Sequence, residues 1–345
     1  MPVVGPSVAE PRPSGPPSRA TASADRDPSG RGWRDLLAGQ AVYRGYRLGA
    51  LASQLVPGGR IPGLAERLGR LGVIAGGDRR AMAARHQRRV RPDLTDAEVD
   101  RAVQDVFASY VRYWVESFRL PGTSAADLDA GFSVDGYEHI EAGLAEGNGV
   151  ILALPHLGGW EWAGFWLTEV KHVGVTVVVE AVEPPELADW FVGLRKELGM
   201  TVIPLGPSAA AEVARALKAN EIVALLCDRD LAGNGIEVDF LGERTTLPGG
   251  PATLAARSGA PLLPAAVYFT DDAHQGIVRP PVDASRSGRL RDDVARITQD
   301  LAGELAWLIR QAPEQWHLLQ PNWPSDALAE AAAVDHAGDD AGDGA

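Results

Sequence analysis

The middle of the chain contains short, nearly continuous apolar runs, and the segments between them carry apolar residues at helical spacing. Such runs are typical of strands that are buried on both faces of a sheet. The predicted strands are Val150–Leu154, Val173–Val179, Thr201–Ile203, Ile222–Leu226, Ile236–Phe240 and Leu262–Phe269. The predicted helices are Tyr137–Glu146, Gly158–Val170, Pro184–Leu198, Ser208–Ala219 and Leu290–Gln311. This alternation predicts an α/β fold, with a mostly parallel central sheet that helices cover on both faces.

The first third of the chain is predicted to be helical. In Trp33–Val56, aromatic residues and leucines recur at roughly helical spacing, and arginines lie between them. Two further helices are predicted over Pro62–Leu71 and from about Asp78 onward. The sequence of Thr95–Glu98 matches a capping box, which opens a long amphipathic helix through Arg119.

The two ends of the chain differ in composition from the rest. Residues 1–30 are rich in Pro, Ser, Gly and Ala, so they cannot bury enough apolar surface to offset the cost of ordering. Ser325–Ala345 carries six acids and no lysine or arginine. We expect both ends to be disordered. Between them we expect a single domain, residues 31–324, with a helical N-terminal part (31–120) and an α/β core (132–324).

Composition excludes several classes of protein. The 345 residues include one cysteine, so neither an internal disulfide nor a Cys-rich metal site is expected. Cys227 follows an apolar run, and we expect it to be a small buried hydrophobe. The net charge of −13 argues against nucleic acid as a partner. The sequence has no apolar run of about 18 residues, so no transmembrane helix is predicted. Its N-terminus lacks the apolar core of a signal peptide, so a cytoplasmic location is expected.

Arginines are concentrated near the start of the chain. Residues 31–91 contain thirteen arginines and no lysine, against Asp35, Glu66 and Asp78, which gives a local balance of +10. A basic segment with interleaved aromatic residues and leucines fits a membrane-associating helix at an anionic membrane surface. The alternatives are a helix packed on the protein's own core and, for the dense arginine run at 79–91, an ordinary solvated face.

A candidate catalytic histidine follows the first apolar run. The strand stops at Pro155, His156 comes next, two glycines follow, and Glu161 lies five positions after His156. Histidine is the side chain whose unperturbed pKa suits proton transfer near neutral pH, and a nearby carboxylate can fix its tautomer. The alternative is a histidine that only satisfies hydrogen bonds beside a turn.

Three charged residues follow another apolar run. Asp228, Arg229 and Asp230 come directly after it, and the carboxyl ends of strands are where open α/β sheets bind ligands. We expect Asp228 or Asp230 to be a second acid near His156, and Arg229 to bind an anion. A turn whose charges satisfy one another is the alternative.

Four more residues are candidates for binding substrate. Gly249 and Gly250 precede a helix with Pro at its first position, where backbone N–H groups can hold a phosphate or an oxyanion. Glu180 ends a predicted strand at the edge expected for His156, and Arg195 lies one helix later. A structural ion pair between Glu180 and Arg195 explains their presence equally well. Signatures of a serine hydrolase, a P-loop, a dinucleotide fold and a zinc site are absent from the sequence.

These motifs together resemble the bacterial lysophospholipid acyltransferase superfamily, in its lipid A lauroyl/myristoyl acyltransferase branch. More narrowly, the chain is similar to actinobacterial phosphatidylinositol mannoside acyltransferases. The resemblance spans about residues 33–324, and four blocks in the same order carry it. The blocks are His156 with Glu161; Phe240–Gly242 followed by Thr245–Pro251; Glu314–His317 with Trp323; and Glu180, Arg195 and the turn Asp228–Asp230, which fall where the mannoside enzymes place further active-site residues.

The resemblance implies transfer of a long acyl chain, palmitoyl by expectation, from acyl-CoA to the 6-hydroxyl of a mannose in phosphatidylinositol mannosides. His156 would be the general base, supported by Glu161 together with Asp230 or Asp228. Backbone N–H groups or Arg195 would stabilise the oxyanion. Acyl-CoA is a substrate, so no cofactor or metal is implied. The enzyme would work peripherally on the cytoplasmic face of the plasma membrane.

Three alternatives remain at this point. The acceptor could be another glycolipid or a lysophospholipid. The His–acid pair could activate water, which would make the chain an acyl-CoA thioesterase. The chain could also be a membrane-bound lipid-binding protein without catalysis.

Overall fold

The computed structural model of the chain describes residues 33–180, 184–271 and 273–328, and the chain divides into two units, residues 1–42 and 43–345. This division lies later in the chain than the boundary expected near residue 31. The disorder expected for residues 1–30, and for most of the acidic end, falls outside the described residues.

The start of the acidic end is part of the folded chain. Residues 324–328 form a helical turn, and the side chain of Asp326 is fully buried. The boundary expected at Ser325 is therefore wrong. Composition could not indicate this, because Asp326, the first acid of the segment, is held by Arg89 and His86, which lie far away in the sequence.

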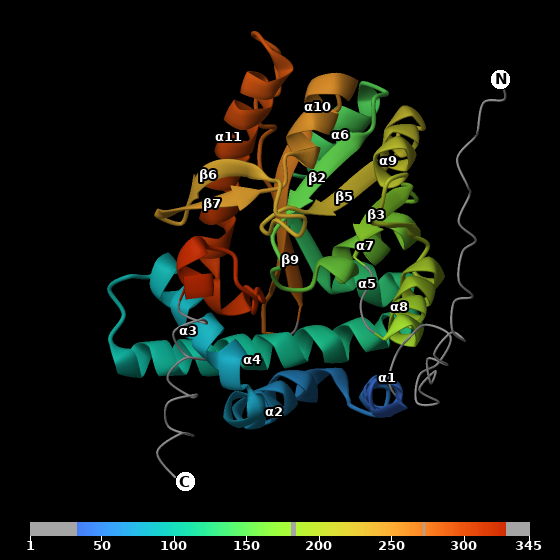
Figure 1. Ribbon diagram of the computed structural model, residues 1–345. Coiled ribbons are helices and arrows are strands. Elements are labelled where there is room, and N and C mark those ends of the chain that lie inside the picture. Colours follow the sequence, from blue (N-terminus) through green and yellow to red (C-terminus); the bar gives the residue numbers. More distant parts are fainter. Residues whose placement is uncertain (1–32, 181–183, 272, 329–345) are drawn as a thin grey trace, which may run out of the picture. The chain divides into compact units, whose positions relative to one another are not determined.

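Seven strands of the described chain form the central sheet, whose main part is parallel (Figure 1). In spatial order they are β1 (Phe132–Asp135), β9 (His274–Val278), β8 (Leu262–Phe269), β2 (Val150–Leu154), β5 (Ile222–Leu226), β3 (Val175–Val179) and β4 (Thr201–Pro204). From β8 to β4 all neighbours are parallel, whereas β9 runs antiparallel to β8. The mostly parallel sheet predicted from the sequence is confirmed.

Helices cover both faces of this sheet, as predicted. Because side chains alternate along a strand, Ile151 and Ala153 pack into one core while Val150 and Leu152 pack into the other. The first core is closed by α9 (Ala209–Lys218), α10 (Gly250–Ser258) and α11 (Leu290–Gln311). The second is closed by α5 (Ala125–Ala130), α6 (Tyr137–Ala145) and α7 (Trp160–Glu169).

One predicted strand lies outside the central sheet. β6 (Ile236–Phe240) pairs antiparallel with β7 (Glu243–Leu247) in a separate two-stranded sheet. Leu241 and Gly242 between them both have positive φ, 52° and 87°, which is the backbone of a tight type I′ hairpin turn. The expectation that Ile236–Phe240 belongs to the parallel sheet is therefore wrong.

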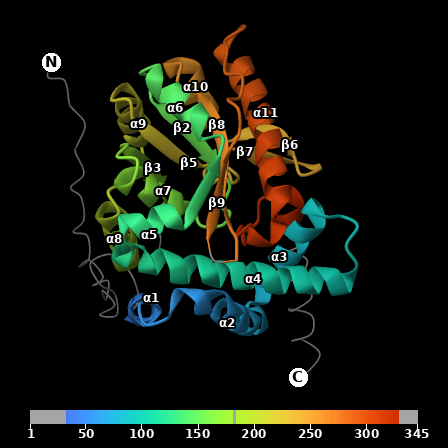
Figure 2. The ribbon, with the colours of Figure 1, turned by 180° about the vertical axis from the view of Figure 1, so that it is seen from behind.

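The predicted N-terminal helices are present as α1 (Trp33–Ser53), α2 (Ile61–Ala75), α3 (Gly77–Val90) and α4 (Asp96–Arg119). The capping box is confirmed, because the Thr95 N–H donates to Glu98 over 2.8 Å. In both views α4 crosses below the sheet, and α2 lies on its other side (Figures 1 and 2). A Cβ at Gly69 would lie 2.6 Å from the Ala108 backbone, so this glycine allows α2 to approach α4 closely. None of the described helices is long and apolar enough to cross a membrane.

Candidate active site

His156 and Asp228 form the centre of the candidate site. β2 and β5 are parallel neighbours, so the residues that follow their carboxyl ends meet at one edge of the sheet. His156 Nδ1 lies 2.6 Å from Asp228 Oδ1, and the His156 backbone N–H donates to Asp228 Oδ2 over 3.0 Å. The expectation that Asp228 is an acid near His156 is thus met, but its buried carboxylate faces the histidine rather than a substrate.

Electrostatics fix the protonation state of this pair. Burial alone would raise the pKa of Asp228, but the His156 imidazole and other hydrogen-bond donors lower it below its usual range. Because an ionised carboxylate only accepts, Nδ1 carries the proton in the neutral form of His156, and Nε2 is the free base of that form. Burial alone would lower the pKa of His156, but the charge and hydrogen bond of Asp228 outweigh it and raise that pKa.

Two exposed or half-exposed charges act on the same imidazole. Arg229 lowers the pKa of His156 and Glu180 raises it, so both charges act on the histidine through space. The His156 side chain is itself 37% exposed, which leaves it accessible to a reactant. The positions of Glu180 and Arg229 agree with the edge predicted for them, and their contact with substrate stays a prediction.

Glu161 does not pair with His156, contrary to the expectation from its spacing. Its Oε1 accepts hydrogen bonds from Tyr113 at 2.6 Å and from Arg195 at 3.0 Å, inside a buried cluster. Burial raises the pKa of Glu161 above its usual range, although Arg195 and Tyr113 act in the opposite direction. Glu161 is the second residue of α7. Its carboxylate is hydrogen-bonded to Tyr113 on α4 and to Arg195 on α8 (Pro185–Glu197).

Asp230 is also not a partner of His156. Its carboxylate accepts from the backbone N–H groups of Ala232, Gly233 and Gly235, and from the Thr246 hydroxyl at 2.9 Å. These hydrogen bonds outweigh the effect of burial and lower the pKa of Asp230. Asp230 therefore shapes the loop after β5, and the expectation that it is an acid paired with His156 is wrong.

The backbone donors around His156 are already used within the protein. The N–H groups of Leu157, Gly158 and Gly159 donate to the carbonyl oxygens of Pro155, Gln315 and Val267, respectively. Arg195, the other expected oxyanion donor, donates to Glu161. The turn after β2 is thus a rigid support for the imidazole and not an oxyanion hole.

Comparison with known proteins identifies the family of the chain. A profile of the bacterial lipid A biosynthesis acyltransferases matches residues 49–325. The chain belongs to this family. Among its relatives, a protein of Mycobacterium tuberculosis is 43% identical over 225 residues, which are 63% of this chain and 69% of that protein. One from Mycolicibacterium smegmatis is 41% identical over 234 residues, 67% of this chain and 75% of its own length.

Both relatives carry the name phosphatidylinositol mannoside acyltransferase. The resemblance found in the sequence is thereby confirmed, and the chain is a glycolipid acyltransferase by family.

The glycine-rich helix start of this acyltransferase is only partly open. Gly249 packs against Ile236 and Val294, where a Cβ would lie 2.9 Å from Ile236, so close packing explains this glycine. At Gly250, the first residue of α10, an added Cβ would meet no atom within 4 Å. Binding of substrate by Gly249 and Gly250 stays a prediction.

The sequence did not assign roles to three residues of the C-terminal segment that touch the acyltransferase site. Trp316 donates its indole N–H to Asp228 Oδ2 over 2.8 Å, and Asn322 donates to the Asp228 carbonyl over 2.9 Å. The His317 backbone N–H donates to the His156 carbonyl over 2.7 Å. The Gln-Trp-His block of the family resemblance was the sequence signal that could have pointed to these residues. Only the folded structure shows that the block contacts both His156 and Asp228.

Two remaining expectations concern cysteine and metal. Cys227 is 1% exposed, and burial raises the pKa of its thiol, as expected for a small buried hydrophobe. Within the described ranges, no group of three or more His, Cys, Asp or Glu side chains is arranged to hold a metal ion.

Proposed function

We propose that the chain transfers a long acyl group, palmitoyl in the simplest case, from acyl-CoA to the 6-hydroxyl of a mannose in phosphatidylinositol mannosides. The observation that carries the proposal is the hydrogen-bonded pair of His156 and Asp228 at the carboxyl edge of the sheet. Family membership supports the acyl transfer, and the names of the relatives support the mannosylated lipid as acceptor.

The pair suits this chemistry because a sugar hydroxyl is a poor nucleophile at neutral pH. His156 Nε2 takes the hydroxyl proton as the oxygen attacks the thioester carbonyl, and Asp228 stabilises the imidazolium that forms. Collapse of the tetrahedral intermediate breaks the carbon–sulfur bond. The departing thiolate then takes the proton from the imidazolium, which yields the ester and CoA with His156 restored.

Arg229 and Glu180 are the proposed substrate-binding charges. Both influence the pKa of His156, and neither side chain has an ion pair within the described residues. The Arg229 guanidinium suits an anionic oxygen, either a phosphate of the donor or the developing oxyanion. The Glu180 carboxylate suits a sugar hydroxyl as a hydrogen-bond acceptor.

An apolar patch supports peripheral binding to an anionic membrane. It is defined by six side chains that are 41–85% exposed: Leu48 and Leu51 on α1, Leu55 in the turn that follows α1, and Leu68, Leu71 and Ile74 on α2. Exposed arginines lie among them in the sequence, including Arg44, Arg47, Arg67 and Arg70. Apolar side chains with interleaved cations match the interface of an anionic leaflet. We propose that the enzyme acts peripherally on the cytoplasmic face of the plasma membrane.

The dense arginine run on α3 contributes less to this surface than its sequence implies. Arg80 pairs with Asp100, Arg88 pairs with Asp96, and Arg89 is held by Asp326. The alternative of an ordinary charged face therefore fits this run better than a dedicated anionic-lipid site.

The test uses purified protein, labelled palmitoyl-CoA, and mannosylated and plain phosphatidylinositols as acceptors. The wild type should acylate the mannosylated lipid, and His156→Ala should abolish the transfer while the far-UV spectrum and melting temperature are preserved. Free fatty acid without an acylated acceptor would instead show a thioesterase. Full transfer by His156→Ala would refute the role of the histidine as base.

A further inference from the structure

Trp316 lies at the back of the histidine–aspartate pair and is itself fully buried, with 1% of its surface exposed. Its indole N–H donates to Asp228 Oδ2 over 2.8 Å, on the carboxylate oxygen that does not bind the imidazole. An indole has one N–H to donate, and in Trp316 that N–H is directed at the carboxylate of Asp228, the proposed partner of the catalytic base His156.

We propose that Trp316 is a positioning residue that fixes the rotation and the charge of the Asp228 carboxylate, and through it the basicity of His156. The inference rests on the proposed function of that pair. It assigns Trp316 a role beyond packing: the side chain is 1% exposed and acts through Asp228, so Trp316 is not itself a catalytic residue.

The hydrogen-bond geometry gives the first argument. Asp228 Oδ1 binds the imidazole, whereas Oδ2 receives two donors, the His156 backbone N–H and the Trp316 indole. Two donors on Oδ2 hold the carboxylate plane, so that Oδ1 stays directed at Nδ1. Asp228 is fully buried, so loss of the indole donor leaves more of the carboxylate charge to be balanced by the imidazole and the His156 backbone N–H.

The rigid surroundings of Trp316 give the second argument. The Gln315 side-chain amide accepts from the Phe269 N–H with Oε1 and donates to the Phe269 carbonyl with Nε2, and the His86 ring stacks on the Trp316 ring with centroids 5.1 Å apart. His86 in turn donates from Nδ1 to the Leu318 carbonyl over 2.8 Å. The indole therefore has little freedom to follow a carboxylate that rotates away.

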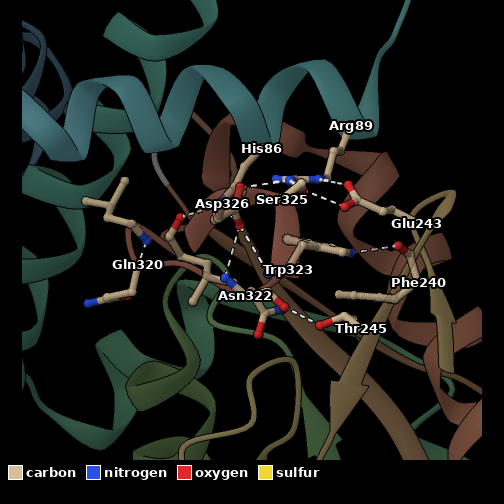
Figure 3. Close-up of polar contacts among 12 residues, drawn as sticks. His86, Arg89, Phe240, Glu243, Thr245, Gln320, Asn322, Trp323, Ser325 and Asp326 are labelled. Atoms are coloured by element: carbon tan, nitrogen blue, oxygen red, sulfur yellow. Dashed lines mark hydrogen bonds and ion pairs between the residues drawn. The ribbon is translucent and has the colours of Figure 1, made fainter. Parts of the chain in front are cut away.

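The C-terminal segment that carries Trp316 is clamped further along by Asp326. This carboxylate receives Arg89 at 2.7 Å and the backbone N–H groups of Asn322 and Trp323, and His86 lies beside it (Figure 3). We refer to Arg89, His86 and Asp326 as the clasp. It joins α3 to the C-terminal segment whose Trp316 contacts the pair of His156 and Asp228.

Trp316→Phe tests the proposal, because it removes the indole N–H and keeps an aromatic ring. Trp323→Phe is the matched control. Trp323 lies in the same segment, is 2% exposed, and donates its indole N–H to the Phe240 carbonyl instead of Asp228. Both variants remove one buried indole donor, so general loss of packing should affect them alike.

The expected result for Trp316→Phe is a kcat at least tenfold lower with little change in KM. The acid limb of its pH–rate profile should move to higher pH, because the imidazole faces a more strongly charged carboxylate. In Trp323→Phe the acid limb of the pH–rate profile should stay at the wild-type pH. The same shift should appear in an NMR titration of the His156 ring, assigned with His156→Asn, in the absence of any substrate.

Identical effects of the two variants, or an unmoved His156 titration in folded Trp316→Phe, would overturn the proposal. The titration also separates the two levels of inference. If wild-type protein transfers no acyl group, the proposed function fails, whereas a shift of the His156 titration in Trp316→Phe still upholds the positioning role.

Discussion

Arg195 donates a 3.0 Å hydrogen bond to Glu161, so the acid five residues after His156 belongs to a buried cluster separate from the histidine. Asp228 holds the imidazole instead. We therefore expect the Asp228→Asn variant to lose about 10³–10⁴-fold in kcat, because the amide cannot fix the reactive tautomer or stabilise the imidazolium. Glu161→Gln keeps an acceptor for Tyr113 and Arg195, and its kcat should stay within about tenfold of wild type.

Steady-state kinetics of both variants at saturating acyl-CoA measure this difference, with melting curves as the control for folding. The reverse order, with Glu161→Gln as the inactive variant, would return the spacing-based pair of His156 and Glu161 to the mechanism.

The pH dependence of the reaction reports the charges around His156. A general base must be neutral, and the pKa of His156 is raised, so kcat/KM should fall as the pH decreases through a value above 6.5. Arg229→Gln should move this acid limb to higher pH, and Glu180→Gln should move it to lower pH, because the two charges act on the imidazole with opposite sign. Shifts in the same direction would contradict the arrangement.

His317 provides an internal reference for that experiment. Burial and the nearby charge of His156 lower the pKa of His317 to about 3, so its ring stays neutral across the working range. Its ring nitrogen lies 2.8 Å from the Ser109 hydroxyl. An NMR titration between pH 5 and 8 should therefore show His156 changing charge while His317 does not.

The strands that carry the site could be predicted to the residue. β2, β5 and β8 are apolar runs that directly follow Gly149, Glu221 and Pro261, and their predicted bounds match the structure. β1, β7 and β9 were missed because they mix polar with apolar residues, which is a weaker signal than an apolar run buried on both faces.

The choice of acid could not be predicted from the sequence. Parallel strands place His156, Asp228 and Asp230 at one edge, but the hydrogen bond depends on β5 lying next to β2 in the strand order. Glu161 had the right spacing along the chain, yet its carboxylate is bonded to α4 and α8. Trp316 reaches Asp228 from 88 residues away, and no local pattern encodes such a contact.

Membrane binding should depend on the apolar patch. Burial of one large aliphatic side chain contributes about 1.5–3 kcal/mol, so Ile74→Glu should weaken binding to anionic vesicles about tenfold or more in sedimentation. Ile74 is 82% exposed, so little of its side chain is packed within the fold. Trp307→Glu on α11 introduces the same charge outside the patch and should leave binding near wild type.

Activity toward acceptor dispersed in detergent should be preserved in both of these variants. Equal binding losses for Ile74→Glu and Trp307→Glu would show that added charge, rather than the patch, controls association.

The clasp should stabilise the fold in a pH-dependent manner. Burial alone would raise the pKa of Asp326, but His86, Arg89 and backbone donors hold it well below its usual range. An acid whose pKa is lower when folded stabilises the protein above its unfolded pKa of about 3.9, and the contribution declines as the pH falls below that value. Breaking such a buried pair costs about 3–5 kcal/mol, so Asp326→Asn should lower the free energy of unfolding by about that amount at pH 7.

Asp100→Asn is the matched control, because Asp100 is 61% exposed and pairs with Arg80, which is 51% exposed. Exposed pairs contribute about 0–1 kcal/mol, so this variant should unfold near the wild-type urea midpoint. The difference between wild type and Asp326→Asn should be constant from pH 5 to 7 and shrink toward pH 3. A difference that stays the same at pH 3 would show that Asp326 stabilises the fold by shape, and not by the charge that joins α3 to the segment carrying Trp316.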